Sequence, residues 1–263
     1  MKAMILAAGL GTRLRPLTND RPKALVEVAG RTLLEIALKR LDSIGVRDVI
    51  VNVHHHAGMV VDYVRSRDNF NMRIEFSREE VLLDTGGGLK KAADFFLRDE
   101  SDEPFLLHNV DVLSTIDLRQ MARFHVEHDA LATLAVQNRE TSRYLLFDGH
   151  GQLCGRRAAA NNDPQRDDLK REDLDRGEPE ETPASGEAVP LAFSGIHVIS
   201  PRIFSSMEET GAFSILTTYL RLAAQGARVI AFRADHSYWR DLGRPEQIAQ
   251  AAEDMRSGVA GNL

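Results

Sequence analysis

Short apolar runs of strand length alternate with segments of helical period through the first two thirds of the chain. Residues 33–44, for example, place apolar side chains along one face of a helix. This alternation is typical of strands and helices that build a doubly wound, Rossmann-like α/β fold. Strands are predicted at residues 3–7, 48–53, 72–76, 105–110 and 131–136. Helices are predicted at residues 33–44, 59–64, 89–96 and 118–128.

Residues 156–188 interrupt this pattern. They contain six Lys or Arg, ten Asp or Glu and only two large apolar residues, Leu169 and Leu174. Such a segment cannot bury much apolar surface, so we expect a solvated, disordered insertion; a lid or a partner-binding segment is the alternative. Beyond it, strands are predicted at 191–199 and 228–232, and helices at 213–224 and 245–255. The chain thus fits a single domain, 1–263, with one insertion.

Charge and composition argue against several classes of protein. The formal net charge of -6 and a pI near 5.9 indicate no basic surface for nucleic acid or an anionic membrane. The first apolar run is too short for a signal peptide or a membrane span, and Cys154 is the only cysteine. We therefore expect a cytoplasmic protein that binds neither nucleic acid nor a membrane, as a monomer or a small homo-oligomer.

The first predicted strand runs directly into the glycine-rich sequence LGTRLRPLT. Gly9 and Gly11 let backbone N–H groups approach phosphate oxygens, and Arg13 and Arg15 add positive charge. The segment lacks both the GxxxxGK[ST] of a P-loop and the third glycine of the dinucleotide fingerprint, so neither a P-loop NTPase nor a Rossmann dehydrogenase is supported. Lys23 follows ten residues after Arg13 and could reach back to the phosphates, although alone it would be read as an exposed lysine.

Two aspartates stand where a hard cation would be useful. Ligands of doubly wound sheets bind beyond the carboxyl ends of the strands, and Asp111 follows the fourth predicted strand. Mg²⁺ is usually held by one or two carboxylates together with substrate phosphates and water. Asp241, in YWRDLG after the last predicted strand, is the best second ligand. Helix capping is the alternative role for either residue.

The run LAAGLGTRLRPLTNDRPKALVEVAG resembles the signature of sugar-1-phosphate nucleotidyltransferases, LAAGxGTRLxPLTxxxPKxLxxVxGxP. The resemblance implies a Rossmann-like mixed sheet and an enzyme that joins a nucleoside triphosphate to a sugar 1-phosphate, releasing pyrophosphate. It implies that Arg13 contacts the phosphates where pyrophosphate departs and that Lys23 stabilises charge on the reacting phosphates. Asp111 and Asp241 would share Mg²⁺, although Val110 stands where the family usually has glycine. The implied nucleotide-binding residues are Leu6, Ala7, Ala8, Gly9, Gly11, Thr12, Arg13, Lys23, Gly86, Gly87 and Asn109, and the implied catalytic residues are Arg13, Lys23 and Asp111.

The sequence DTGGG at residues 84–88 resembles the ETGGG of N-acetylmuramate-1-phosphate uridylyltransferases, enzymes of peptidoglycan recycling. Its glycines precede a predicted helix and leave room for a flat ligand. The resemblance implies that the backbone around Gly86, with Leu6 and Ala7, reads the uracil of UTP. Ser194 and Gly195, in AFSGIHVI, are the sugar-side candidates.

The acceptor sugar stays open, because the EKP segment with which many relatives touch the sugar is replaced here by the charged insertion. One alternative is a heptose, mannose or glucose phosphate with GTP, CTP or dTTP as donor. Another is a non-catalytic regulatory subunit that binds a nucleotide sugar, since a fold resemblance does not prove activity.

Overall fold

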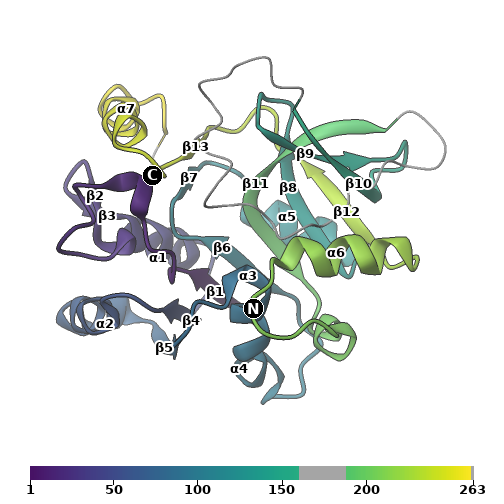
Figure 1. Ribbon diagram of the computed structural model, residues 1–263, viewed down its shortest axis with the longest axis horizontal. Coiled ribbons are helices and arrows are strands. Elements are labelled where there is room, and N and C mark those ends of the chain that lie inside the picture. The colour runs from purple at the N-terminus through teal and green to yellow at the C-terminus, as the bar shows by residue number, and fades with distance from the viewer. Residues whose placement is uncertain (160–187, 262–263) are drawn as a thin grey trace.

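The computed structural model describes residues 1–159 and 188–261. These residues form an α/β fold in which helices flank a mixed β-sheet (Figure 1). The strands of the main sheet run in the order β10-β9-β11-β6-β1-β4-β5, and β8 pairs with both β11 and β12. They are β1 (Lys2–Leu6), β4 (Asp48–Val53), β5 (Arg73–Arg78), β6 (Phe105–Asn109), β8 (Ala132–Gln137), β9 (Arg143–Phe147), β10 (Leu153–Ala158), β11 (Val189–Ile199) and β12 (Val229–Arg233).

The strand directions divide the sheet into two parts. β5, β4, β1 and β6 are parallel neighbours, as alternating strands and helices predict. β11 then runs antiparallel to β6, β8 and β9, while β12 is parallel to β8. This arrangement confirms the predicted doubly wound, Rossmann-like fold with a mixed sheet.

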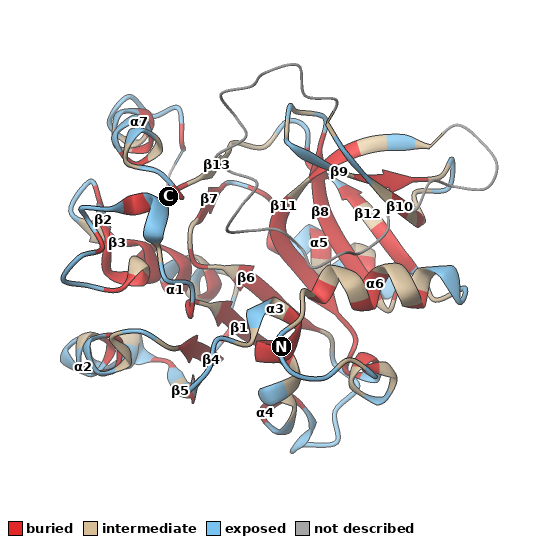
Figure 2. Ribbon diagram, viewed as in Figure 1, coloured by how far each residue is buried: buried red, intermediate tan, exposed pale blue. Residues whose placement is uncertain are grey.

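Helices cover both faces of the sheet. Ala3 and Ile5 of β1 belong to the same core cluster as the apolar face of α1, whereas Met4 belongs to a second cluster with α4 and α6. Figure 2 shows that buried positions concentrate on the central strands. The helices are α1 (Leu33–Ser43), α2 (Ala57–Ser66), α3 (Asp84–Lys91), α4 (Ala93–Leu97), α5 (Leu118–Glu127), α6 (Ile215–Ala224) and α7 (Pro245–Arg256).

Local signals in the sequence set the starts of two of these helices. The Thr32 hydroxyl accepts a hydrogen bond from the N–H of Glu35 at the start of α1. The Asp117 carboxylate accepts one from the N–H of Gln120 at the start of α5. Each cap satisfies an N–H group that the helix leaves without an intrahelical partner.

Six strands have no counterpart in the predicted elements: β9 and β10 of the main sheet, and four shorter strands outside it. β2 (Glu27–Val28) and β3 (Arg31–Thr32) form a small hairpin, and β7 (Val112–Ser114) pairs antiparallel with β13 (Trp239–Asp241). In the second pair Asp241 lies opposite Val112, and Figure 1 shows β13 beside β7. This pairing brings a late segment of the chain to the carboxyl end of β6.

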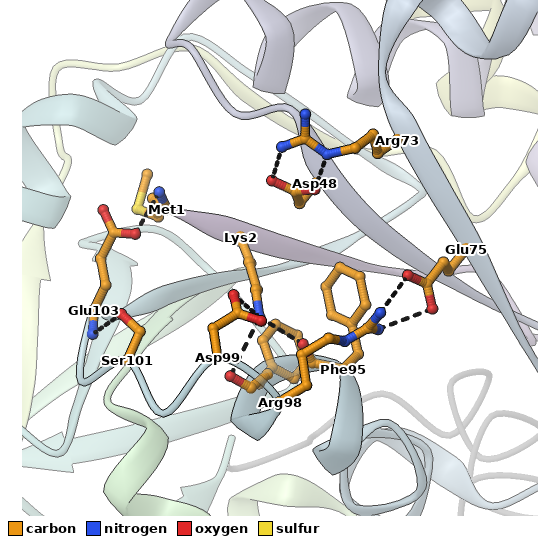
Figure 3. A network of polar contacts seen from close by, with 11 residues as sticks. Met1, Lys2, Asp48, Arg73, Glu75, Phe95, Arg98, Asp99, Ser101 and Glu103 are labelled. Atoms are coloured by element: carbon orange, nitrogen blue, oxygen red, sulfur yellow. Dashed lines mark hydrogen bonds and ion pairs between the residues drawn. The ribbon is translucent and has the colours of Figure 1, made fainter.

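Ionic side chains hold the opposite end of the parallel strands (Figure 3). The ammonium of Lys2 contacts Asp99 at 2.7 Å and donates to the carbonyl of Phe95 at 2.7 Å. Arg73 pairs with Asp48 across the first residues of β5 and β4. Exposed ion pairs of this kind contribute little to stability. They also lie at the end of the sheet opposite to the carboxyl ends of the parallel strands.

Two predictions about the insertion and the helices change in detail. Residues 156–158 belong to β10, so strand pairing continues into the predicted insertion, while 160–187 lie outside the described residues. The helix predicted at 89–96 begins earlier, at Asp84, and is divided into α3 and α4. Among the described residues, no helix has the length and apolar character needed to cross a membrane. Cytoplasmic location and oligomeric state stay predictions.

Candidate active site

The loop after β1 folds back on itself at Gly11. This glycine has a φ of 66°, and a Cβ there would lie 3.0 Å from Cγ2 of Thr18 and 3.1 Å from Cβ of Lys23. The Thr18 hydroxyl donates to the Gly11 carbonyl at 2.8 Å. A residue with a side chain would be strained at this φ and crowded by its neighbours. Gly9, Thr12 and Arg13 stay exposed on the outside of the loop, where a ligand can reach them.

Lys23 and Asp111 form an ion pair at the carboxyl end of β6. The ammonium donates to Oδ2 of Asp111, and the two side chains are only 12% and 14% exposed. Burial by itself would raise the pKa of Asp111. The charge and the hydrogen bond of Lys23, with a smaller contribution from Arg13, instead hold the pKa of this carboxyl below its ordinary value. Asp111 is therefore ionised at neutral pH.

Asp241 joins this pair from β13. The N–H of Leu242 donates to the Asp111 carbonyl at 2.8 Å, and Oδ1 of Asp241 accepts from the N–H of Gly243 at 2.7 Å. Burial and the neighbouring charge of Asp111 raise the pKa of Asp241. Two predicted metal ligands thus lie close enough to repel each other.

Arg13 reaches the same place from the glycine loop. A Cβ on Gly243 would lie 2.6 Å from Oδ1 of Asp241 and 3.2 Å from Nη2 of Arg13. Only glycine leaves room for both groups. The four charged residues predicted to act on phosphate or metal, Arg13, Lys23, Asp111 and Asp241, therefore meet at one point.

The chemistry of this set fits a hard divalent cation. A positive charge between two carboxylates offsets their mutual repulsion. Two protein carboxylates together with substrate phosphates are a common environment for Mg²⁺. No group of three or more His, Cys, Asp or Glu with metal-binding geometry occurs in the described ranges 1–159 and 188–261. A cation here would hence depend on oxygens of the substrate as further ligands.

The predicted sugar-side residues Ser194 and Gly195 are buried in β11. Ser194 is wholly buried, and its carbonyl accepts from Nε1 of Trp239 at 2.8 Å. Gly195 is also buried, and with a φ of 71° its missing Cβ would lie 2.9 Å from Nδ2 of Asn109. A register shift in the β11·β8 pairing falls at this point. Both residues thus pack against the ends of β6 and β13 from inside, and their contact with the sugar stays a prediction.

The triglycine sequence at residues 86–88 packs closely against another part of the chain. Gly86 and Gly87 lie within α3, and a Cβ on Gly86 would lie 2.3 Å from the Phe213 ring. Both glycine N–H groups donate to the Phe213 carbonyl, at 2.9 Å and 3.3 Å. The segment before α6 therefore fills the side on which a Gly86 side chain would stand, and the contact of this region with a nucleobase stays a prediction.

Sequence reasoning missed a buried polar network beneath the glycine loop. Oδ1 of Asn52 accepts from the N–H of Ala7 at 2.6 Å, and Nδ2 of Asn52 donates to Oε1 of Glu79 at 2.7 Å. Oε2 of Glu79 accepts from the N–H of Leu83 at 2.9 Å. The network ties the loop after β1 to the start of α3. Polar residues at or just beyond the carboxyl ends of two neighbouring strands were the available signal.

Arg139 was missed as well. It follows β8, and its guanidinium carbon lies 3.5 Å from the centre of the Trp239 ring system. Nη2 donates to the Phe193 carbonyl at 2.7 Å. Burial lowers the pKa of Arg139 to about 10, and the charges of Asp241 and Tyr144 act in the opposite direction. Nothing in the sequence distinguishes this arginine from its exposed neighbours.

Comparison with known proteins gives the class of protein to which this fold and this charged cluster belong. Residues 2–149 match the Nucleotidyl transferase family. The chain is 35% identical to N-acetylmuramate alpha-1-phosphate uridylyltransferase from Caulobacter vibrioides, with 98% of this chain and 97% of that protein covered. The chain belongs to the nucleotidyl transferase family, as its sequence predicts, and is an enzyme of this class.

More distant relatives agree on the class or the fold. Mannose-1-phosphate guanyltransferase from Aspergillus fumigatus is 29% identical over 94% of this chain, which spans 62% of that protein. HddC from Yersinia pseudotuberculosis, solved in complex with GMP-PN, superposes with a TM-score of 0.71 at 21% identity and covers 97% of this chain and 99% of its own. At that identity, the superposition supports the fold alone.

Proposed function

We propose that this enzyme transfers a uridylyl group from UTP to N-acetylmuramate 1-phosphate, with Mg²⁺, and releases pyrophosphate. The observation that carries the nucleotidyl transfer is the meeting of Asp111 and Asp241 with Lys23 and Arg13 at the carboxyl end of β6. The choice of uridylyl and muramate rests on the Caulobacter relative, which this chain matches over almost its full length.

The reaction brings two anions together, so the site must neutralise charge and align the reactants. A phosphate oxygen of the sugar attacks the α-phosphorus of the triphosphate in line, and the bond to the leaving pyrophosphate breaks. No general base is needed, because the attacking oxygen is already ionised. Positioning and electrostatic stabilisation then supply the catalysis.

The residues of this chain divide that work. Lys23 stabilises the charge that builds on the reacting phosphate, and Arg13, exposed on the loop, faces the departing pyrophosphate. Asp111 and Asp241 would hold Mg²⁺, which supplies charge neutralisation and orientation of the phosphates when bound. The glycine loop presents backbone N–H groups to the triphosphate. Leu6, Ala7 and Ala8 lie under the base, and Asn52 fixes Ala7 from below.

The test is a panel of nucleoside triphosphates against sugar 1-phosphates, with pyrophosphate release as the readout. We expect turnover with UTP and N-acetylmuramate 1-phosphate, and its loss when EDTA removes Mg²⁺. Turnover with another pair, such as GTP and mannose 1-phosphate, would keep the site and overturn the substrates. Silence across the panel, together with a stoichiometric partner protein, would instead support the regulatory subunit.

A further inference from the structure

Arg139 is a cation held by neutral partners. Its described neighbours are the Trp239 ring, at 3.5 Å from the guanidinium carbon, and the Phe193 carbonyl, at 2.7 Å from Nη2. Among the ion pairs of the described residues none joins Arg139 to a carboxylate within 4.0 Å. By contrast, Lys23 is paired with Asp111, and Arg240 with Asp254. A partly buried cation without a counter-charge is unfavourable unless something else supplies one.

The groups around Arg139 are also incompletely satisfied. Its Nε is buried without a hydrogen-bond partner, as is the hydroxyl of Ser194, the residue after Phe193. Buried polar groups in native proteins are almost always paired, so the unpaired Nε of a cation needs an explanation. Arg139 as a whole remains partly exposed, which leaves it reachable by a ligand.

The position of Arg139 indicates which ligand would supply the missing negative charge. Trp239, on which it lies, begins β13, and Asp241 stands two residues further along the same strand. The charge of Asp241 acts on the guanidinium. Arg139 is therefore near the carboxylate pair, but it comes from the connection after β8, and β8 and β1 lie on opposite sides of β6 in the sheet.

We propose that Arg139, supported by Trp239, is an acceptor-binding residue that pairs with an anionic oxygen of the acceptor sugar phosphate. This deepens the proposed function and rests on it. Two groups of the acceptor carry such oxygens: the 1-phosphate, present in every candidate acceptor, and the lactyl carboxylate, present only in the muramate sugar. Arginine binds either anion through two parallel hydrogen bonds.

Trp239 provides a readout that does not depend on turnover. It is the only tryptophan of the chain, so intrinsic fluorescence reports directly on the ring beneath Arg139. The protein is saturated with Mg²⁺ and a non-hydrolysable UTP analogue, then titrated with N-acetylmuramate 1-phosphate or with N-acetylglucosamine 1-phosphate, which lacks the carboxylate. Wild type is compared with Arg139→Met, which keeps an apolar side chain on the ring, and with Arg139→Lys. Arg228→Gln, an exposed arginine before β12, is the matched control.

We expect Arg139→Met to raise the dissociation constant of the acceptor about tenfold or more, and Arg139→Lys to raise it less, while both bind the UTP analogue like wild type. Equal weakening of both sugars assigns Arg139 to the 1-phosphate, and weakening of the muramate sugar alone assigns it to the carboxylate. Unchanged affinity for both sugars overturns the proposal. If Arg139→Met does not fold, as judged by circular dichroism, Arg139→Lys decides by the same criterion.

Failure of the proposed function would look different. In that case wild type releases no pyrophosphate with UTP and N-acetylmuramate 1-phosphate but turns over another pair. The titration is then repeated with that acceptor and its own nucleotide analogue. A loss of acceptor affinity in Arg139→Met would then still support Arg139 as an acceptor-binding residue. Unchanged affinity would overturn that role.

Discussion

The ammonium group of Lys23 donates a hydrogen bond to Oδ2 of Asp111, although 88 residues separate the two in the sequence. The lysine follows the glycine loop proposed to receive the nucleotide, and the aspartate is one of the two carboxylates proposed to hold Mg²⁺. Each residue therefore fixes the other before substrate arrives, which is the preorganisation that electrostatic catalysis requires.

Replacing Lys23 by alanine should lower kcat by about 10² to 10³, with a smaller effect on nucleotide affinity, because the ammonium acts on charge that develops during transfer. Steady-state pyrophosphate release and equilibrium binding of a UTP analogue separate the two effects. Lys39→Ala, at an exposed lysine of α1, is the control. Nearly normal turnover in Lys23→Ala would remove this residue from the mechanism.

Replacing Asp241 by asparagine should lower the Mg²⁺-dependent kcat by a factor of about 10² or more. The same change should raise the melting temperature of the metal-free protein, because burial and the charge of Asp111 both raise the pKa of Asp241 and so disfavour its ionised form. An asparagine oxygen can still accept from Gly243. Thermal unfolding with and without Mg²⁺ checks both parts. A variant that is less stable than wild type without metal would contradict the repulsion between the two carboxylates.

Gly195→Ala should destabilise the protein by about 2 kcal/mol or more, through its φ of 71° and a Cβ 2.8 Å from Val112. Gly226 is a matched control, since it has a φ of 90° but no atom within 4 Å of its missing Cβ. Denaturant unfolding of the two variants separates backbone strain from crowding. Equal losses would mean that the contact with β7 and Asn109 is not tight.

His125 should make the protein less stable in acid. It is buried on α5, its Nδ1 lies 2.9 Å from the Thr133 hydroxyl, and burial lowers its pKa to about 4 from 6.5. The unfolded chain takes up this proton first, so the free energy of unfolding is unaffected well above pH 6.5 and decreases as pH falls toward 4 by up to about 1.4 kcal/mol per unit.

His125→Gln should therefore reduce the dependence of stability on pH by that amount between pH 6 and 4, measured by urea unfolding. Exposed His150→Gln controls for the loss of a histidine elsewhere. An unchanged pH slope in His125→Gln would show that this residue takes up its proton alike in the folded and unfolded chain.

Long, strongly periodic elements could be predicted from the sequence. β4 spans residues 48–53 as predicted, and α5 ends one residue before its predicted boundary. The glycine loop after β1 could also be predicted, because its residues are consecutive in the sequence. The turn at Gly11 requires a glycine for local reasons, independent of distant parts of the chain. Periodicity and local turn chemistry act within a short stretch of chain, so the sequence contains them directly.

Features that depend on distant partners could not be predicted. β7 and β13 are three residues each, too short for a periodic pattern, and only their pairing explains how Asp241 meets Asp111. Gly86 was expected to leave room for a flat ligand, and Gly195 was a sugar-side candidate, but the close approaches that the structure shows at their missing Cβ atoms are to Phe213 and Asn109. A glycine shows that something approaches the backbone closely, but the sequence does not say whether it is substrate or protein.

The pairing of β13 with β7 also affects the order in which a newly made chain acquires its parts. A nascent chain has released β1, the glycine loop and Lys23 from the ribosome long before Trp239–Asp241 is synthesised. Until then Asp111 lacks its partner carboxylate, and the two-aspartate site does not exist. If the two aspartates hold Mg²⁺ as proposed, a chain that ends before β13 lacks the metal site and should not transfer nucleotides.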